Sequence, residues 1–289
     1  MTSFLVLQSG ALRCEIRPDL GGCITGLWLG DVPVLRSAPA HTVATARLGG
    51  SYAMVPFSNR IAHAHLLWQG TSHPLVQNNA PEPHAIHGHG WQRAWEVLEA
   101  DATSVLMAFE HQPDAAWPFA FDTSQSLRIT ADTLEITLSA TNQSKTEAPI
   151  GLGWHPYFAR RAQSHIAFRA EGRWENGAEM LPTQRLPNAG IDSTCAALDV
   201  DHCFDGWNGE VLLQDELLQT RIRSNLDHLV VFTNASKNFV AIEPVSHVNN
   251  ALNLMAAGRY NAAALGVTVL QPGETKTATM SIQVVEARS

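Results

Sequence analysis

Residues 127–140 read LRITADTLEITLSA, and this stretch decides the fold class of the 289-residue chain. Apolar and polar residues alternate over residues 127–130 and again over 134–140, on both sides of a short connection that contains Asp132. A period of two places the apolar side chains on one face of a strand. The stretch therefore predicts a β-hairpin with one buried face.

Further segments have the same strand character. They are residues 12–16, 105–109, 229–232, 239–242 and 280–284, the last of which follows the turn signal QPGE at 271–274. Helical periodicity is nearly absent, and the best helix candidate is residues 250–256. Many strands, frequent Gly and Pro, and no β-α-β alternation predict an all-β antiparallel sandwich or barrel. Because we find no linker or internal repeat, we predict a single domain over residues 1–289.

Composition excludes several classes of partner and chemistry. Hydrophobic residues make up 45% of the chain, enough for a packed core, and the formal net charge of -8 gives no general attraction for nucleic acid or anionic lipid. No signal peptide or membrane span is recognisable. Four cysteines without a C-x-x-C pair suit a reducing cytoplasm. The sequence lacks a P-loop and a G-x-S-x-G elbow.

His155 and Glu243 share a local feature that suggests chemistry. Each follows an apolar, strand-like run and precedes a proline, which pushes its backbone toward the extended region. We therefore expect both side chains at the end of a strand, on a backbone with little freedom, as a positioned acid or base requires. The alternatives are a solvated strand-end carboxylate for Glu243 and a hydrogen-bonded core histidine for His155.

Arg60 and two tryptophans are further candidates. Arg60 lies in an apolar and small-residue stretch, where it either forms a structural ion pair or binds a ligand. Trp91 and Trp154 lie close to the polar segments and could form an apolar floor for the C–H faces of a sugar, although most tryptophans belong to a core.

A cluster of histidines requires a metal site to be considered. His87 and His89 in a strand would share one face, and Glu96 follows at roughly the spacing of a cupin metal site. Gly88 and Gly90 indicate a loop instead. A metal-dependent, cupin-like sugar isomerase is therefore kept as an alternative.

Five motifs, in order along the chain, resemble those of the aldose 1-epimerase (galactose mutarotase) family. Each is weak alone, but the ordered set is specific and covers nearly the whole chain. The motifs are PFSNRI at 56–61, HG at 87–88, GWHPYF at 153–158, DHCF at 201–204, and EP at 243–244 followed by NALN at 250–253.

The resemblance implies a large antiparallel β-supersandwich and an isomerase that interconverts the α and β anomers of a free sugar without a metal or organic cofactor. It implies roles for six residues: Glu243 as the general base, His155 as the general acid, His87 as a second active-site histidine, Arg60 and Asp201 as ligands of sugar hydroxyls, and Asn59 as a shaper of the loop. We add Trp154 as an expected sugar-stacking residue. From ordinary side-chain pKa values we expect an ionised Glu243 near neutrality and a partly protonated His155.

The identity of the sugar stays open at this stage. The HGHGW segment at 87–91 departs from the common H-G-G of galactose mutarotases, so the substrate is a neutral hexose or an acidic sugar such as a hexose 6-phosphate. An acidic sugar needs an extra cation, for which Arg93, Arg160 and Arg161 lie near the motifs in sequence. A non-catalytic sugar-binding protein on the same fold is a second alternative. The sequence does not reveal the oligomeric state.

Overall fold

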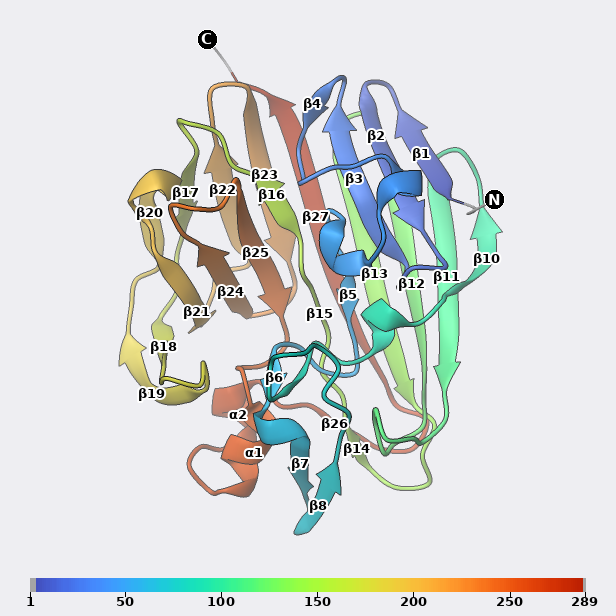
Figure 1. The fold of residues 1–289 in the computed structure, drawn as a ribbon, viewed down its shortest axis with the longest axis vertical. Helices are drawn as coiled ribbons and strands as arrows, with labels where there is room; N and C mark the ends of the chain where they lie inside the picture. Colours follow the sequence, from blue (N-terminus) through green and yellow to red (C-terminus); the bar gives the residue numbers. More distant parts are fainter. Residues whose placement is uncertain (1–3, 288–289) are drawn as a thin grey trace.

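The computed structural model describes residues 4–287 and consists mainly of antiparallel strands (Figure 1). Within these residues the largest sheet has nine strands. In sheet order they are β10 (Glu96–Ala100), β11 (Ser104–His111), β12 (Phe121–Ile129), β13 (Thr133–Asn142), β27 (Thr275–Glu286), β23 (Leu218–Ser224), β22 (Glu210–Gln214), β17 (His165–Phe168) and β20 (Ile191–Thr194). The predicted hairpin is confirmed as β12 and β13, with Leu127 opposite Ile136.

Two smaller sheets lie in front of the large one (Figure 1). The first has β1 (Leu5–Ser9), β2 (Leu12–Arg17), β3 (Cys23–Leu29) and β4 (Val32–Pro33). The second has β19 (Pro182–Pro187), β18 (Gly172–Asn176), β21 (Val200–Asp205), β24 (His228–Thr233), β25 (Phe239–Val245), β15 (Gly153–Trp154) and β5 (Ala53–Met54), with β16 (Tyr157–Ala159) also paired to β25. Apolar side chains from all three sheets form one core cluster, so the predicted all-β sandwich is confirmed.

Short elements gather below the sheets (Figure 1). They are β6 (Arg60–Ile61), β7 (His65–Trp68), β8 (Thr71–Pro74), β9 (Ala85–Ile86), β14 (Ala148–Pro149), β26 (Val269–Leu270), α1 (Ala251–Ala256) and α2 (Ala262–Leu265). The 3-10 turns are η1 (Ala40–Thr42), η2 (Ala46–Leu48), η3 (Ala62–Ala64), η4 (Gly90–Gln92) and η5 (Cys195–Ala197). Helix α1 confirms the expected helix at 250–256. Among the described residues, no helix has the length and apolar character that crossing a bilayer requires.

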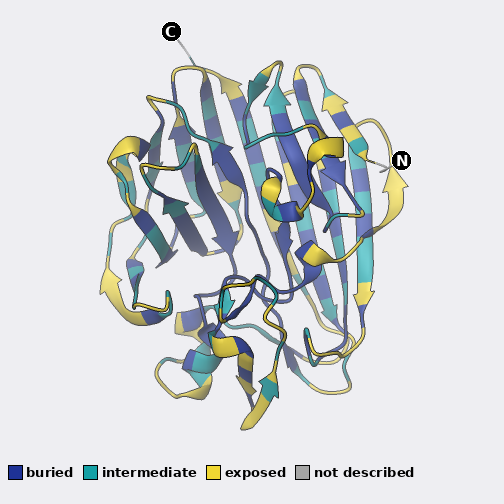
Figure 2. Cartoon of the chain, in the orientation of Figure 1, coloured by how far each residue is buried: buried dark blue, intermediate teal, exposed yellow. Residues whose placement is uncertain are grey.

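Burial differs between the two main sheets (Figure 2). Along β13 buried positions alternate with more exposed ones, as expected for a strand with one face on the core. Along β25 all residues after Phe239 are buried, so the face turned away from the core is covered as well. A polar side chain on that covered face is therefore shielded from solvent while it remains next to a cleft.

Candidate active site

A cleft of about 740 Å³ opens over the covered face of the sheet that contains β25. Strands β21, β24 and β25 supply its floor, and the loops that follow β5 and β9 supply one wall. The residues that line it include Asn59, Arg60, His87, His155, Asp201 and Glu243. Six of the seven site residues predicted from the sequence therefore meet in one cavity, whose volume is in the range of small-molecule sites.

His155 and Glu243 occupy opposite positions on neighbouring strands. Gly153 of β15 pairs with Val245 of β25, and Tyr157 of β16 pairs with Ala241 of the same strand. This common register puts His155 directly across from Glu243. Opposite residues of an antiparallel pair project from the same face of the sheet, and their side chains are close neighbours. Accordingly, Nε2 of His155 lies 3.2 Å from Oε1 of Glu243.

Two prolines flank this pair and keep the backbone bonding around it incomplete. The Ile242 N–H donates to the Pro156 carbonyl at 3.3 Å, but Pro156 and Pro244 have no N–H to donate in return. The His155 N–H points the other way, to the Tyr52 carbonyl at 3.0 Å. The pair is thus of the non-hydrogen-bonded type, in which side chains approach most closely. The expectation that Glu243 ends its strand was wrong, since β25 continues to Val245.

Burial controls the protonation of both groups. Glu243 and His155 retain only 3% and 8% of their accessible surface. Burial raises the pKa of Glu243 well above its usual value, and the nearby Asp201 carboxylate adds to the rise while Arg60 opposes it. Burial also lowers the pKa of His155 to about 3, helped by the Arg47 and Arg36 charges. The expected ionised Glu243 and partly protonated His155 are therefore corrected: desolvation favours the neutral form of each.

His87 and Asn59 hold one another. The His87 N–H donates to the Asn59 carbonyl at 2.8 Å, and the Asn59 N–H donates to Nδ1 of His87 at 3.1 Å. The Nδ1 atom is thus an acceptor, which leaves the ring hydrogen on Nε2. Burial lowers the pKa of His87 well below its usual value, so the ring is a neutral donor. The next residue must be Gly88, because a Cβ there would lie 2.1 Å from the Val55 carbonyl oxygen.

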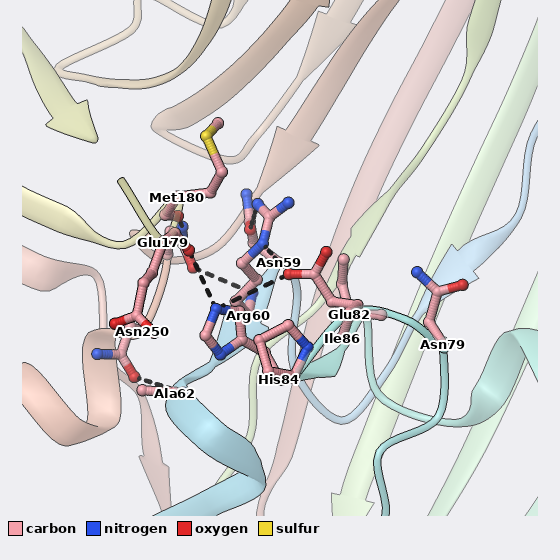
Figure 3. Close-up of polar contacts among 12 residues, drawn as sticks. Asn59, Arg60, Ala62, Asn79, Glu82, His84, Ile86, Glu179, Met180 and Asn250 are labelled. Carbon is pink, nitrogen blue, oxygen red and sulfur yellow. Dashed lines mark hydrogen bonds and ion pairs between the residues drawn. The ribbon is translucent and has the colours of Figure 1, made fainter. Parts of the chain in front are cut away.

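Arg60 and Asp201 approach the cleft from different elements. Arg60 lies on β6 opposite Ile86, and its Nε atom pairs with Oε1 of Glu82 at 2.7 Å (Figure 3). Its Nη1 atom donates to Oδ1 of Asn59 at 3.2 Å. Asp201 lies on β21, where burial raises its pKa and the Arg60 charge lowers it. The ion pair expected for Arg60 is formed. Arg60 also lines the cleft, and its role in ligand binding stays a prediction.

The structure does not bring Trp154 into the cleft. Its ring is fully buried in the core, and its Nε1 atom donates to Oε1 of Gln125 on β12 at 3.2 Å. Because side chains alternate along an extended chain, the neighbour of His155 must face the opposite way. The expected sugar-stacking role of Trp154 is therefore wrong. The aromatic side chains that do line the cleft are those of Trp91, Tyr157, Phe232 and Phe239.

The other histidines of the sequence cluster are dispersed. His89 points away from His87 and packs against His111, with ring centroids 4.4 Å apart, while Glu96 is exposed on β10. His84 accepts a bond from the His63 N–H and contacts the Glu179 carbonyl (Figure 3). Across residues 4–287, no three His, Cys, Asp or Glu side chains are grouped as metal ligands. The cupin-like arrangement of His87, His89 and Glu96 is not formed.

Sequence reasoning missed three cations of the cleft, Arg36, Arg47 and Lys237. None of them lies in a family motif, and their distant positions in the chain gave no signal. The three arginines named from the sequence have other partners. Arg93 pairs with Asp114 and Arg161 with Asp215, while Arg160 donates to the Asn234 and Ala235 carbonyls.

Comparisons with known proteins give matches over nearly the whole chain. The family model described as aldose 1-epimerase matches residues 4–283. The uncharacterized protein YphB of Escherichia coli (strain K12) is 30% identical over 295 residues, with 96% of this chain and 97% of that protein covered. A solved structure of an aldose 1-epimerase-like protein of Escherichia coli K12 has a TM-score of 0.87 at 26% identity and covers 99% of both chains.

More distant structures share the fold. The galactose 1-epimerase of Lactobacillus acidophilus NCFM has a TM-score of 0.79 at 14% identity, with 99% of this chain and 95% of that chain covered. At that identity the likeness supports the fold alone. Together with the strand arrangement, it confirms the expected β-supersandwich of the galactose mutarotase type.

Proposed function

The chain belongs to the aldose 1-epimerase family, and from this premise we propose that it interconverts the α and β anomers of a free aldose or aldose derivative. The observation that carries the proposal is the buried contact between Nε2 of His155 and Oε1 of Glu243 in a cleft of sugar size. A shielded imidazole next to a shielded carboxylate is suited to proton transfer rather than to binding alone.

The reaction requires two proton transfers at neighbouring atoms. Ring opening removes a proton from the O1 hydroxyl and delivers one to the ring oxygen O5, after which rotation about C1–C2 and closure reverse both transfers. Because O1 and O5 are bonded to the same carbon, the two groups that serve them must be adjacent. In our proposal Glu243 is the base for O1 and His155 the acid for O5. The C1–O5 bond breaks as the O1 proton leaves and the C1=O1 carbonyl forms, and closure re-forms that bond on either face of C1. Because no oxidation state changes, the chemistry needs no metal or organic cofactor.

Sugar binding must redistribute one proton within the pair. In the empty cleft burial favours a protonated Glu243 and an uncharged His155. Transfer of that proton from Glu243 to His155 creates the base and the acid together, with no change in net charge. Sugar hydroxyls that donate to the carboxylate favour this state, because hydrogen bonds to the charged form lower the pKa of an acid. The catalytically active form is therefore produced by the substrate itself.

The remaining polar groups would hold the sugar in place. His87 offers its Nε2 hydrogen, and Arg60 and Asp201 offer a donor and an acceptor for hydroxyls. Asn59 keeps His87 and Arg60 in position through the bonds described above. A sugar ring held in place keeps O1 and O5 next to their proton-transfer groups, which lowers the entropic part of the barrier.

The proposal includes the domain organisation, the partners and the cellular location of the protein. We take residues 1–289 as one domain that acts on a small-molecule sugar, without nucleic acid or membrane as a partner. The four cysteines are free and buried, as suits the reducing cytoplasm that we propose as its location. The sequence and the described residues carry no argument about oligomeric state.

The direct test is anomer exchange measured by NMR or polarimetry. Purified protein with a chelator present should accelerate exchange of at least one aldose above the spontaneous rate. His155→Asn should lose most of this acceleration, whereas His165→Asn, a change of a partly exposed histidine on β17, should keep it. Sugar binding without acceleration would favour the alternative of a non-catalytic sugar-binding protein, and loss of activity in the chelator would favour a metal-dependent isomerase.

A further inference from the structure

The cleft has an excess of positive charge in a chain whose net charge is negative. Four cations line it, Arg36, Arg47, Arg60 and Lys237, against the two carboxylates of Asp201 and Glu243. Arg60 is already neutralised by Glu82. Within residues 4–287, the other three cations form no ion pair with a carboxylate. Three unpaired cations therefore share one cleft.

Arg36 is held in place by the backbone rather than by an acid. Its Nε and Nη2 atoms donate to the Gly49 carbonyl at 3.0 and 2.7 Å, and Nη2 also donates to the Arg47 carbonyl. The guanidinium lies 3.8 Å from the centre of the Tyr157 ring. Burial lowers the pKa of Arg36, so its charge is poorly solvated. A fixed, partly buried guanidinium without a counterion is well prepared to receive an anion.

The positions of the other two cations extend this feature. Arg47, on η2, has one side-chain contact, from Nη1 to Oδ1 of Asn79, which is a neutral acceptor. Lys237 lies in the turn between β24 and β25, two residues before Phe239, whose ring centre is 5.1 Å from the guanidinium of Arg36. The three charges therefore come from three separate segments and line the same cleft.

A chain of contacts leads from Glu243 through His155 and Tyr157 to Arg36. Glu243 contacts His155, and the His155 ring packs on Tyr157 with centroids 4.3 Å apart. Tyr157 in turn packs against Arg36. In an aldopyranose O1 is followed by C1, O5, C5 and C6. If Glu243 serves O1 and His155 serves O5, the cations lie beyond O5, where the C6 substituent projects.

We propose that the substrate is an aldose with an anionic group at C6, a phosphate or a carboxylate, bound by Arg36, Arg47 and Lys237. The inference rests on the proposed epimerase function and adds the class of sugar. The cations act mainly on binding, because none of them contacts Glu243 or His155 directly and the Tyr157 ring lies between Arg36 and His155. Their loss should therefore raise KM for an anionic sugar more than it lowers kcat.

The experiment compares matched sugars of different charge. Exchange NMR on the full chain gives kcat/KM for glucose, glucose 6-phosphate and glucuronate, and for the corresponding galacto sugars. At least one anionic sugar should exceed its neutral counterpart by about tenfold or more, the effect of a single charge-assisted contact. The 6-phosphate and uronate arms distinguish the two anions. Raising the salt concentration should reduce kcat/KM for the anionic sugar only.

Variants identify the residues responsible. Arg47→Gln and Lys237→Gln should each lower the preference for the anionic over the neutral sugar by about tenfold. Arg128→Gln, which removes one charge from an exposed position on β12, should leave that preference unchanged. Circular dichroism verifies folding, and two variants from separate segments protect against misfolding of either one. Equal turnover of neutral and anionic sugars, or an unchanged preference in both cleft variants, would overturn the inference.

A failure of the epimerase proposal gives a different result. In that case no sugar of either charge exchanges faster than it does spontaneously. Calorimetric binding of glucose 6-phosphate and glucuronate to the wild type, Arg47→Gln and Lys237→Gln still tests the anion site. Weaker binding in both variants supports it, and no binding of either anion to the wild type refutes it.

Discussion

Replacement of Glu243 by Gln tests both the chemistry and the electrostatics of the site. The amide has nearly the size of the carboxyl group and can keep the 3.2 Å contact with His155, but it cannot take up a proton. Positioned acid–base catalysis contributes about 10²–10⁴-fold to a rate. We therefore expect kcat to fall by about 10²–10⁴, or about 3–5 kcal/mol of barrier, while the affinity for the sugar changes little.

The same substitution should alter the pH dependence of stability. Because burial raises the pKa of Glu243, the folded state holds this proton more tightly than the unfolded chain does. The resulting stability is present below the unfolded pKa and is lost as pH rises through the higher folded pKa. Each pKa unit corresponds to about 1.4 kcal/mol. Gln cannot ionise, so Glu243→Gln should gain in stability over the wild type as pH increases.

Two assays examine these expectations with one control. Exchange NMR measures the rate, and urea unfolding at pH 5 and at pH 8 measures the free energy of unfolding. Glu135→Gln, at an exposed position of β13, removes a carboxylate that is not buried and should change neither quantity by much. A rate close to that of the wild type would refute the role of Glu243 as the base. A parallel pH dependence in both proteins would refute the electrostatic reasoning.

Three further predictions concern the neighbouring residues. His155→Asn should reduce the exchange rate by about 10²–10⁴, as seen by polarimetry, and a loss below tenfold would mean that another group supplies the acid. Trp154→Phe should lower the free energy of unfolding by about 1–3 kcal/mol, because Gln125 loses its buried hydrogen-bond partner. Urea titration measures this change. A raised KM for the sugar would contradict our assignment of Trp154 to the core. In Glu243→Gln, which removes the opposing titration of Glu243, stability should fall as pH drops from about 6.5 toward about 3, since burial lowers the pKa of both His155 and His89 to about 3 while the unfolded chain takes up those protons earlier. Unchanged urea midpoints of this variant between pH 7 and pH 5 would exclude the linkage.

The fold was readable from local alternation wherever a strand had one face on the core. Strands β12 and β13 keep a strict period of two because solvent and core impose opposite demands on adjacent residues. Strand β25 is buried on both faces and gave only an apolar run, so its end was misjudged at Glu243. Helix α2 has four residues, which is too short for a periodic signal.

The site residues could be predicted from the sequence only where they lie in a family motif. Register, burial and side-chain direction depend on pairing between distant segments, which one sequence does not reveal. For this reason Arg36 was not expected in the cleft. The expectation for Trp154 failed for a local reason, because an extended chain turns the neighbour of His155 to the opposite face. Protonation was misjudged because the ordinary pKa values of Glu243 and His155 apply in water and not in a buried site.

The incomplete backbone bonding around Glu243 has a consequence for how this site can vary. His155 and Glu243 lie opposite one another in an antiparallel pair. The geometry of this pair is set by main-chain pairing and by Pro156 and Pro244. Other amino acids at positions 155 and 243 would have the same spacing, because the backbone pairing sets it. Substitution of His155 and Glu243 alone could thus introduce different proton-transfer groups while the rest of the fold is unchanged.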